Sequence, residues 1–398
     1  MGDASSVRLA FSKETTWGVI VATGSQAQRI TSVSPKLRAN TVQSGEIDPT
    51  RQPSGAVRTS KSAELSFGYE LSLVPPVASP GTGFDLLTEG AMMSSWSTIV
   101  ALAAASFHLG APTGNSFVIT GTGTSVVTGW VTGQVIRLSG YSTNQTVYAR
   151  ITVPGTTTAL AEGVRATGLA VTAESGIASI AVAGSYIRTA AVKQSYTAQV
   201  DFSDLTTPEY SVLSGLRVGT WEEKFTPEGL VAGTFTFQGK TQATATATSL
   251  NTPTLKWSTP RINTTDANFK NKMEGTFAST STLRIAEINF RLDNRLRTDL
   301  ELGTAGPGDI GLSNPTLEGT IVAYMADGVL LRKYEADTLT KLSWMVDDGT
   351  RQRVYSMNNV RLKDASAEAT GNDATVRVTI PFSVEPDATG VAFQVDRF

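Results

Sequence analysis

Residues 57 to 73 alternate polar and apolar side chains, the pattern of a β-strand with one buried face. From residue 63 onward one face is wholly apolar, with Ala63, Leu65, Phe67, Tyr69, Leu71 and Leu73. At about 3.3 Å per residue the run would span roughly 50 Å, far longer than the usual strand of about five or six residues. A strand this long either projects beyond its own domain or joins a sheet shared between subunits.

Further alternating segments extend the β pattern through the chain. They cover residues 231–240, 317–325 and 376–384, and residues 288–302 are interpreted as a hairpin that turns at Asp293-Asn294. Helical patterns are scarce: one covers 84–94, and another begins at Asp337 and ends before Gly349. The sequence therefore predicts a mainly β fold, a sandwich or barrel core with one or two short helices and long strand extensions.

The composition changes between residues 107 and 190. This stretch is rich in Gly, Thr, Ala, Ser and Val, and turn residues divide it into short strands. The strands are predicted at 116–120, 135–138, 148–153, 169–172 and 179–182. We interpret residues 107–190 as an inserted small all-β domain, immunoglobulin-like (Ig-like), between two parts of a core at 1–106 and 191–398.

Composition and charge exclude several classes of function. The net charge is −2 and Lys and Arg form no cluster, whereas a protein that grips nucleic acid presents a basic face. With no cysteine and one histidine, His108, the chain has no disulfide, thiolate site or multi-histidine metal site. The most apolar stretch, 98–107, has about half of the ~20 residues that cross a bilayer, and the N-terminus lacks a signal-peptide pattern. We expect no cofactor, no metal and no membrane partner.

No catalytic constellation is recognisable. Glu222 and Glu223 are adjacent, and neighbours on a strand point to opposite faces, so they cannot act together on one bond. The glycine-rich stretches 121–125 and 303–311 lack the Lys-Ser/Thr ending of a phosphate-binding loop. The chain is therefore predicted not to be an enzyme.

Several segments, taken in order, resemble the major tail tube proteins of long-tailed, non-contractile bacteriophages, the siphophages. They are ETTWGV (14–19), SPKLRANTVQSGEIDPTRQ (34–52), FDLLTEGAMMSSW (84–96), GQVIRLSGY (133–141), SYTAQVDFSDL (195–205), INFRLDNRLRTDLELG (288–303) and LEGTIVAYMADGVLLRKY (317–334). No single segment decides the matter, but together they extend over most of the chain.

The resemblance implies a structural virion protein, made in the host cytoplasm, with two packed β-sheets flanked by a helix. Six copies would close a ring, and rings would stack through long hairpins or loops, with the insert on the outside. The tube would surround the tape-measure protein, contact tail terminator and tail tip proteins, and later conduct genomic DNA without binding it specifically. A trimer of chains with two tube-like halves each remains an alternative.

Candidate functional residues follow from this interpretation. The polar face with Arg58, Glu64 and Glu70 would line the channel, or would simply be a solvated face of the sheet. The second strand of the long hairpin is expected at 72–83, where prolines interrupt it. Candidate contacts between rings or subunits are Leu37, Arg38, Glu46, Ile47, Asp48, Arg51, Asp293, Asn294 and Arg295.

Two other classes of function remain open at this stage. One is a virion or cell-surface adhesin whose Ig-like insert binds carbohydrate, with Trp130, Tyr141, Tyr148 and Tyr186 as ring candidates. The other is a β-rich polysaccharide depolymerase, which would need convergent carboxylates that the sequence does not suggest.

Overall fold

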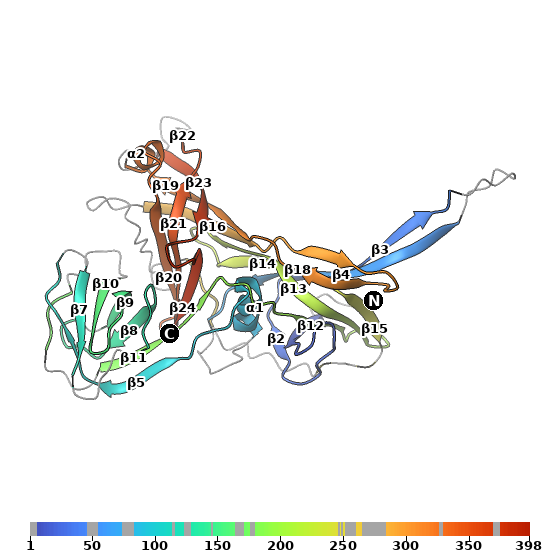
Figure 1. Ribbon diagram of the computed structural model, residues 1–398, viewed down its shortest axis with the longest axis horizontal. Coiled ribbons are helices and arrows are strands. Elements are labelled where there is room, and N and C mark those ends of the chain that lie inside the picture. The colour runs from blue at the N-terminus through green and yellow to red at the C-terminus, as the bar shows by residue number, and fades with distance from the viewer. Residues whose placement is uncertain are drawn as a thin grey trace.

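The computed structural model describes residues 6–45, 55–73, 83–113, 116–122, 129–144, 146–163, 171–175, 180–245, 247, 250, 260–264, 284–325, 329–368 and 375–398. The fold is mainly β, with 57% strand and 5% helix, which confirms the predicted fold class. The helices of the described part are α1 (Gly83–Met92) and α2 (Val329–Glu335). Figure 1 shows a strand-rich core, a smaller β unit at one end and a two-stranded projection at the other.

The first sheet of the core holds the N-terminal strand. Its antiparallel order is β2, β1, β12, β13 and β15, with bounds β2 (Gln26–Gln28), β1 (Arg8–Lys13), β12 (Tyr196–Phe202), β13 (Glu209–Phe225) and β15 (Thr241–Ala245). Only the first half of β13 belongs to this sheet.

The second sheet is larger and takes the other half of β13. Its order is β3, β4, β14, β13, β16, β19, β23, β21 and β20. The bounds are β3 (Ser32–Gln43), β4 (Ala56–Glu70), β14 (Ala232–Gly239), β16 (Arg284–Asp293), β19 (Thr316–Tyr324), β23 (Arg377–Glu385), β21 (Gln352–Leu362) and β20 (Thr340–Asp347). Two short strands extend it: β22 (Ser366–Glu368) pairs with β23, and β24 (Phe393–Arg397) pairs with β21.

Strand β13 changes sheets at Gly215. The pairing with β12 shifts register there, and Gly215 has φ +68°, a conformation that glycine adopts without strain. A Cβ at this position would also lie 3.1 Å from the Nε1 atom of Trp17. The glycine therefore permits both the bend and the close approach of the N-terminal loop.

Aromatic side chains fill the core between the layers. Trp221 is fully buried, stacks on Phe235 with a centroid distance of 5.9 Å, and meets Phe290 edge-on at 5.1 Å. Trp344 of β20 and Tyr355 of β21, at the far end of the second sheet, stack on each other with a centroid distance of 5.1 Å. Such pairs each contribute about 0.5–1.5 kcal/mol beyond the burial of their area.

The inserted unit is one continuous curled sheet with its own core. Its antiparallel order is β6, β7, β10, β9, β8, β11 and β5, and only Ser106 separates the two edge strands β5 and β6. The bounds are β5 (Val100–Ala105), β6 (Phe107–Leu109), β7 (Ser116–Gly121), β8 (Val135–Ser139), β9 (Thr146–Val153), β10 (Thr158–Gly163) and β11 (Ile180–Arg188). Residues 107–190 therefore form a small β unit, while its Ig-like character and its boundaries stay predictions.

The insert is fixed to the core by shared structure. Strand β11 belongs to the insert sheet through its first residues and pairs with β24 of the core through Ser185–Arg188. The buried carboxylate of Asp396 accepts the backbone N–H of Val135 at 3.0 Å, and Arg150 donates to the Ser343 hydroxyl at 2.6 Å. Burial raises the pKa of Asp396 to about 7, although Gln394 and the Val135 N–H offset part of the rise.

Three predicted elements are wrong. Strand β16 pairs with β19, and the residues after Asn294 enter the short strand β17 (Arg297–Leu300), which pairs with β18 (Pro307–Gly311), so residues 288–302 form no hairpin. The helix expected from Asp337 is strand β20, because Leu342, Trp344 and Val346 alternate into the core.

The third error concerns the long hairpin. The partner of β4 is β3, which lies upstream of it, and not the segment 72–83, of which 74–82 lies outside the described residues. The prediction missed β3 because its side chains are exposed on both faces and leave no alternating pattern. Helix α1 and the alternating strands β4, β14, β19 and β23 are confirmed.

Candidate assembly surface

The outer parts of β3 and β4 form a two-stranded arm, which we define as residues 36–43 and 56–62. Beyond Ala63 of β4, where the pairing with β14 ends, the two strands stay paired as far as Gln43 opposite Ala56. Nearly every side chain on the arm is exposed, including the aliphatic pair Val42 (56%) and Val57 (64%). An exposed pair of long strands is an open template for contact with another chain.

The residues predicted as contacts fall partly on this arm. Leu37 is exposed, and Arg38 forms an ion pair with Glu64, with 2.7 Å between Nε and Oε1. Arg58, which was predicted to face the channel with Glu64 and Glu70, is exposed on the arm opposite Thr41. Glu46, Ile47, Asp48 and Arg51 lie outside the described residues.

A short hairpin, β17–β18, lies against the base of the arm, and we call it the flap. The backbone N–H of Lys61 on β4 donates to the carbonyl of Ala305 in the flap turn at 2.8 Å. Leu300 is 64% exposed and Leu302 fully exposed on the outer side of the flap. The flap thus steadies the arm and presents two leucines to solvent.

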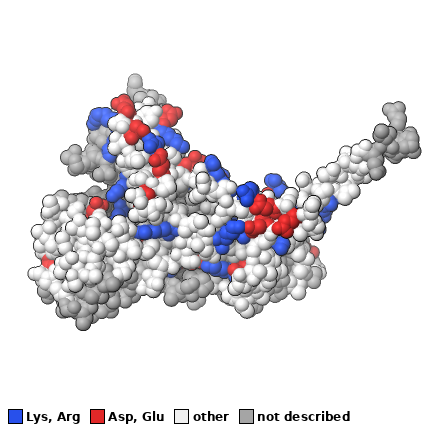
Figure 2. Space-filling model, in the orientation of Figure 1, with Lys and Arg blue, Asp and Glu red and all other residues white. Residues whose placement is uncertain are grey.

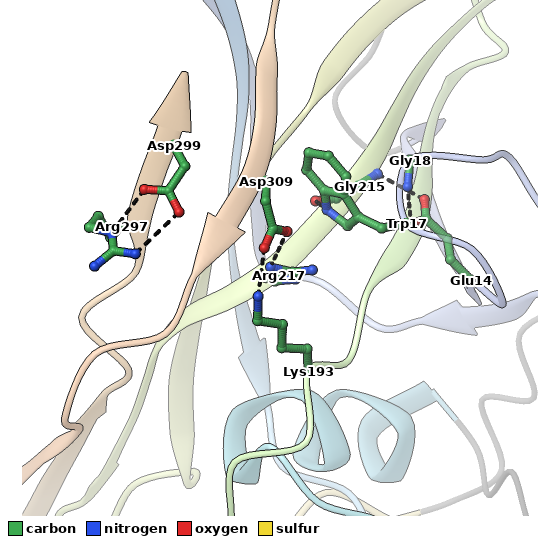
Figure 3. A network of polar contacts seen from close by, with 9 residues as sticks. All are labelled: Glu14, Trp17, Gly18, Lys193, Gly215, Arg217, Arg297, Asp299 and Asp309. Carbon is green, nitrogen blue, oxygen red and sulfur yellow. Dashed lines mark hydrogen bonds and ion pairs between the residues drawn. The ribbon is translucent and has the colours of Figure 1, made fainter. Parts of the chain in front are cut away.

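A polar network holds the flap in place (Figure 3). Asp309 of β18 forms ion pairs with Lys193 at 2.5 Å and with Arg217 of β13 at 2.9 Å. Burial alone would raise the pKa of Asp309, but the hydrogen bonds from Lys193, the Ile310 N–H and Arg217 bring it below its ordinary value. Side chains from three distant segments thus fix the orientation of the flap.

The same figure shows how the N-terminal loop is anchored. The buried carboxylate of Glu14 accepts the backbone N–H groups of Gly18 and Gly215, both at 2.8 Å. The indole of Trp17 donates to the Gly215 carbonyl at 3.0 Å, and Lys240 lies over its ring. The N-terminal loop, the bend of β13 and the flap are thus joined by polar contacts at the base of the arm, and we call them together the platform.

The segment after β16 has a mixed role. Asp293 and Arg295 are at the surface, and the Asp293 carboxylate accepts the Arg295 backbone N–H at 2.8 Å. Asn294 is 5% exposed, and its amide donates to the carbonyls of Ala91 and Val218 at 3.0 Å each. Its side chain therefore ties α1 to β13 within the chain, and only its two neighbours face outward.

The outer face of the second sheet carries Glu64 and Glu70, two of the three residues predicted to face the channel. Four cations at this face are paired with carboxylates: Arg38 with Glu64, Arg261 with Glu70 at 2.5 Å, Lys224 with Glu287 at 3.0 Å, and Arg291 with Glu222 at 2.6 Å. Between these pairs the face is made largely of small polar residues such as Ser66, Thr234 and Thr320. A guanidinium that is already paired with a carboxylate attracts a DNA phosphate only weakly.

Glu223 behaves as predicted for a residue adjacent to Glu222, pointing to the opposite face. It is buried, accepts the Tyr69 hydroxyl at 2.7 Å, and Tyr69 in turn accepts the Trp221 indole N–H at 2.8 Å. Burial raises the pKa of Glu223, and burial beside Glu223 raises that of Tyr69. Gly233 lies between Tyr69 and Glu223 in the sheet register, so the tyrosine ring crosses over it.

A buried ion cluster joins α1 to the core. The Asp85 carboxylate at the start of α1 receives Arg353 of β21 at 2.5 Å and Arg397 of β24, and all three side chains are at most 6% exposed. Arg353 also lies over the Phe84 ring at 4.5 Å, and Arg397 over Trp96 at 4.1 Å. Burial would lower the pKa of Arg353, but Tyr355, Asp85 and Glu223 together raise it, so this cation stays charged.

The described residues lack two kinds of feature, a metal-binding cluster and a membrane-spanning helix. In that part of the chain no three His, Asp or Glu side chains are grouped so as to hold a metal ion. None of the described helices has the length and apolar character needed to cross a bilayer. Of the ring candidates, Trp130 and Tyr141 are buried inside the insert, and Tyr148 is buried against Phe398 of the core. Tyr186 is half-buried with Arg188 over its ring, so the four rings form no exposed platform for a sugar.

A family model described as phage tail tube protein matches residues 4–384. The chain belongs to this family. It is a structural tail tube protein and a component of the phage virion, and its family is not a family of enzymes. No curated protein matches the chain. The match extends across the insert and both parts of the core, as the resemblance of the ordered segments predicted.

Sequence reasoning missed most of the platform. Lys193, Arg217 and Asp309 are far apart in the chain, and each taken alone is an ordinary surface charge. The ion cluster of Asp85 could not be predicted for the same reason, because the two arginines that pair with Asp85 are more than 260 positions away in the sequence. The one available signal was Trp17 beside Gly18, a large aromatic next to a glycine in the loop between two strands.

Proposed function

We propose that this tail tube protein polymerises as six-membered rings that stack into the tube of a long, non-contractile tail. The tube surrounds the tape-measure protein during assembly, ends at tail terminator and tail tip proteins, and later conducts DNA to the host. The arm is the observation that carries the proposal. Beyond Ala63 the two long strands pair with each other and with no further strand among the described residues, which fits a contact with the next ring.

The outer face of the second sheet lines the channel in this proposal. The paired cations and the small hydroxyl side chains leave DNA few groups to hold it, as conduction requires. The arm and the platform supply the contacts between copies, through Leu37, Arg38, Asp293 and Arg295. A head-to-tail contact that does not close on itself produces a filament, which is the form of a tail.

Electron microscopy of the purified chain tests the assembly. We expect tubes with a regular ring repeat, and a variant without residues 40–58 should give folded, unassembled protein. A chain that stays monomeric at high concentration and is dispensable for tail formation would remove the proposal.

A charge reversal tests the channel face. Glu64→Lys with Glu70→Lys raises the net charge of each copy by four and also releases Arg38 and Arg261 from their partners. We expect intact tubes and impaired DNA delivery in a phage that depends on the variant. The matched control is Glu162→Lys with Glu209→Lys, which makes the same change of charge on the insert and on the first sheet, away from this face. Equal infectivity of both double variants would remove the channel assignment.

A further inference from the structure

The outer surface of the insert carries a row of exposed aliphatic side chains. Leu160 of β10 lies opposite Val118 of β7 on one side and opposite Val153 of β9 on the other. Their exposures are 42%, 37% and 58%. Three cross-strand neighbours therefore form one continuous apolar row, unlike the isolated apolar residues found on most surfaces.

Few charged side chains surround the row, and Glu162, two residues from Leu160 on the same face of β10, is one of them. Figure 2 shows that Lys, Arg, Asp and Glu gather on the core and at the base of the arm, whereas the visible face of the insert is nearly free of them. Gly110 lies beside Val118 and donates its N–H to the Val118 carbonyl at 2.8 Å, which keeps this edge of the row flat. In Figure 1, β7 and β10 lie on the side of the insert away from the core.

The chemistry of the row favours a protein partner. Nucleic acid would need cations, and carbohydrate would need exposed rings, whereas Trp130 and Tyr141 are buried in the insert core. A row of three side chains is far smaller than the roughly 800 Å² per partner of a stable interface between free proteins. It can contribute only where the partner is already held close by other contacts.

We propose that this row packs against a second copy of the chain within the assembled tube. The inference rests on the proposed polymerisation, which supplies a neighbour at high local concentration. The insert can present the row in a fixed direction because β11 runs continuously from the insert sheet into the pairing with β24. The insert thus adds a contact outside the main wall and strengthens the joint between copies.

A pair of substitutions tests the contact. Leu160→Asp with Val153→Asp places charge on the row without touching the core, so the unassembled chain should keep its melting temperature. The concentration needed for tube formation should rise at least about tenfold, since burial of two large aliphatic side chains is lost. Thr158→Asp is the matched control, because Thr158 is exposed on the same face of β10. Equal thresholds for all variants would overturn the inference.

A photo-cross-link separates this inference from the proposed function. A benzophenone amino acid at position 160 in purified tubes should capture a second copy, and peptide mapping should place the adduct between chains. A wild-type preparation without tubes overturns both proposals. Tubes in which position 160 captures no second copy overturn only the role of the row.

Discussion

Replacement of Asp85 by asparagine should destabilise the monomer more than any surface change. The substitution keeps the shape of the side chain but removes the anion between Arg353 and Arg397. These two guanidinium groups are 3% and 6% exposed, so water cannot take the place of the carboxylate. Loss of one partner of a buried ion cluster typically destabilises by about 3–5 kcal/mol.

The expected loss can be expressed as a melting temperature. At about 2.1 cal/mol/K per residue, a chain of 398 residues has an unfolding entropy near 0.8 kcal/mol/K. A loss of about 4 kcal/mol therefore lowers the Tm by about 5 °C. Calorimetry on the unassembled chain measures this directly, with Asp299→Asn as the control, because Asp299 pairs with Arg297 at the surface.

A double variant tests the reason for the loss. Asp85→Asn with Arg397→Met leaves one buried cation, Arg353, facing one buried anion, Glu223, so the charges balance again. We expect the double variant to be at least as stable as Asp85→Asn alone. A Tm change below about 1 °C for Asp85→Asn, or strictly additive losses in the double variant, would refute the reasoning.

Three further outcomes are expected. Gly233→Ala should lower the free energy of unfolding by about 2–4 kcal/mol, because a Cβ there would lie 2.4 Å from the Tyr69 hydroxyl and would displace it from its buried partner. Glu174→Gln should destabilise the insert at pH 7 but not near pH 2. Burial raises the pKa of Glu174, but hydrogen bonds from residues 142–144 lower it from 4.5 to about 2. The stability that the Glu174 carboxylate contributes is therefore present above pH 4.5 and is lost as the pH falls to 2. Val42→Asp with Val57→Asp, a cross-strand pair on the arm, should prevent tube formation and leave the monomer Tm unchanged.

Each of these outcomes has a control. Gly55→Ala adds a Cβ with no atom within 4 Å and should be neutral in chemical denaturation. Glu162→Gln removes an insert carboxylate elsewhere and should not reproduce the acid dependence of the Glu174 variant. Asn40→Asp adds one charge on the arm without removing apolar surface, and tubes should form. Loss of tubes with Asn40→Asp would show that the arm tolerates no added negative charge and that the aliphatic pair is not the cause.

The fold could be predicted from the sequence where one face of a strand is buried. In β4 the residues Leu65, Phe67 and Tyr69 face the core and alternate with polar neighbours, so the pattern records the environment directly. Strand β3 has no buried face, and its conformation is imposed by twelve residues of pairing with β4. A strand that is stabilised only by pairing with its neighbour shows no alternation of polar and apolar residues in its own sequence.

Strand β20 shows the opposite failure, since its apolar residues fit two periods at once. Leu339, Leu342 and Met345 have helical spacing, whereas Leu342, Trp344 and Val346 have strand spacing. The structure resolves the choice in favour of the strand because β21 supplies the backbone partners and Trp344 stacks on Tyr355. The spacing of residues within 337–348 could not distinguish a helix from a strand, because the strand is determined by pairing with β21, which follows a turn.

The charge on the arm also bears on how free copies avoid uncontrolled association. A long unpaired edge invites association with any other edge, and natural proteins suppress this with charge, especially lysine. The described part of the arm carries Lys36, Arg38, Arg58 and Lys61 and no acidic residue. The arms of two free copies therefore repel each other, while Arg38 keeps its carboxylate partner Glu64 at the base. A surface that should pair only in the assembled tube needs both features. Exposed backbone allows contact with the next ring, and like charges oppose pairing between the arms of free copies.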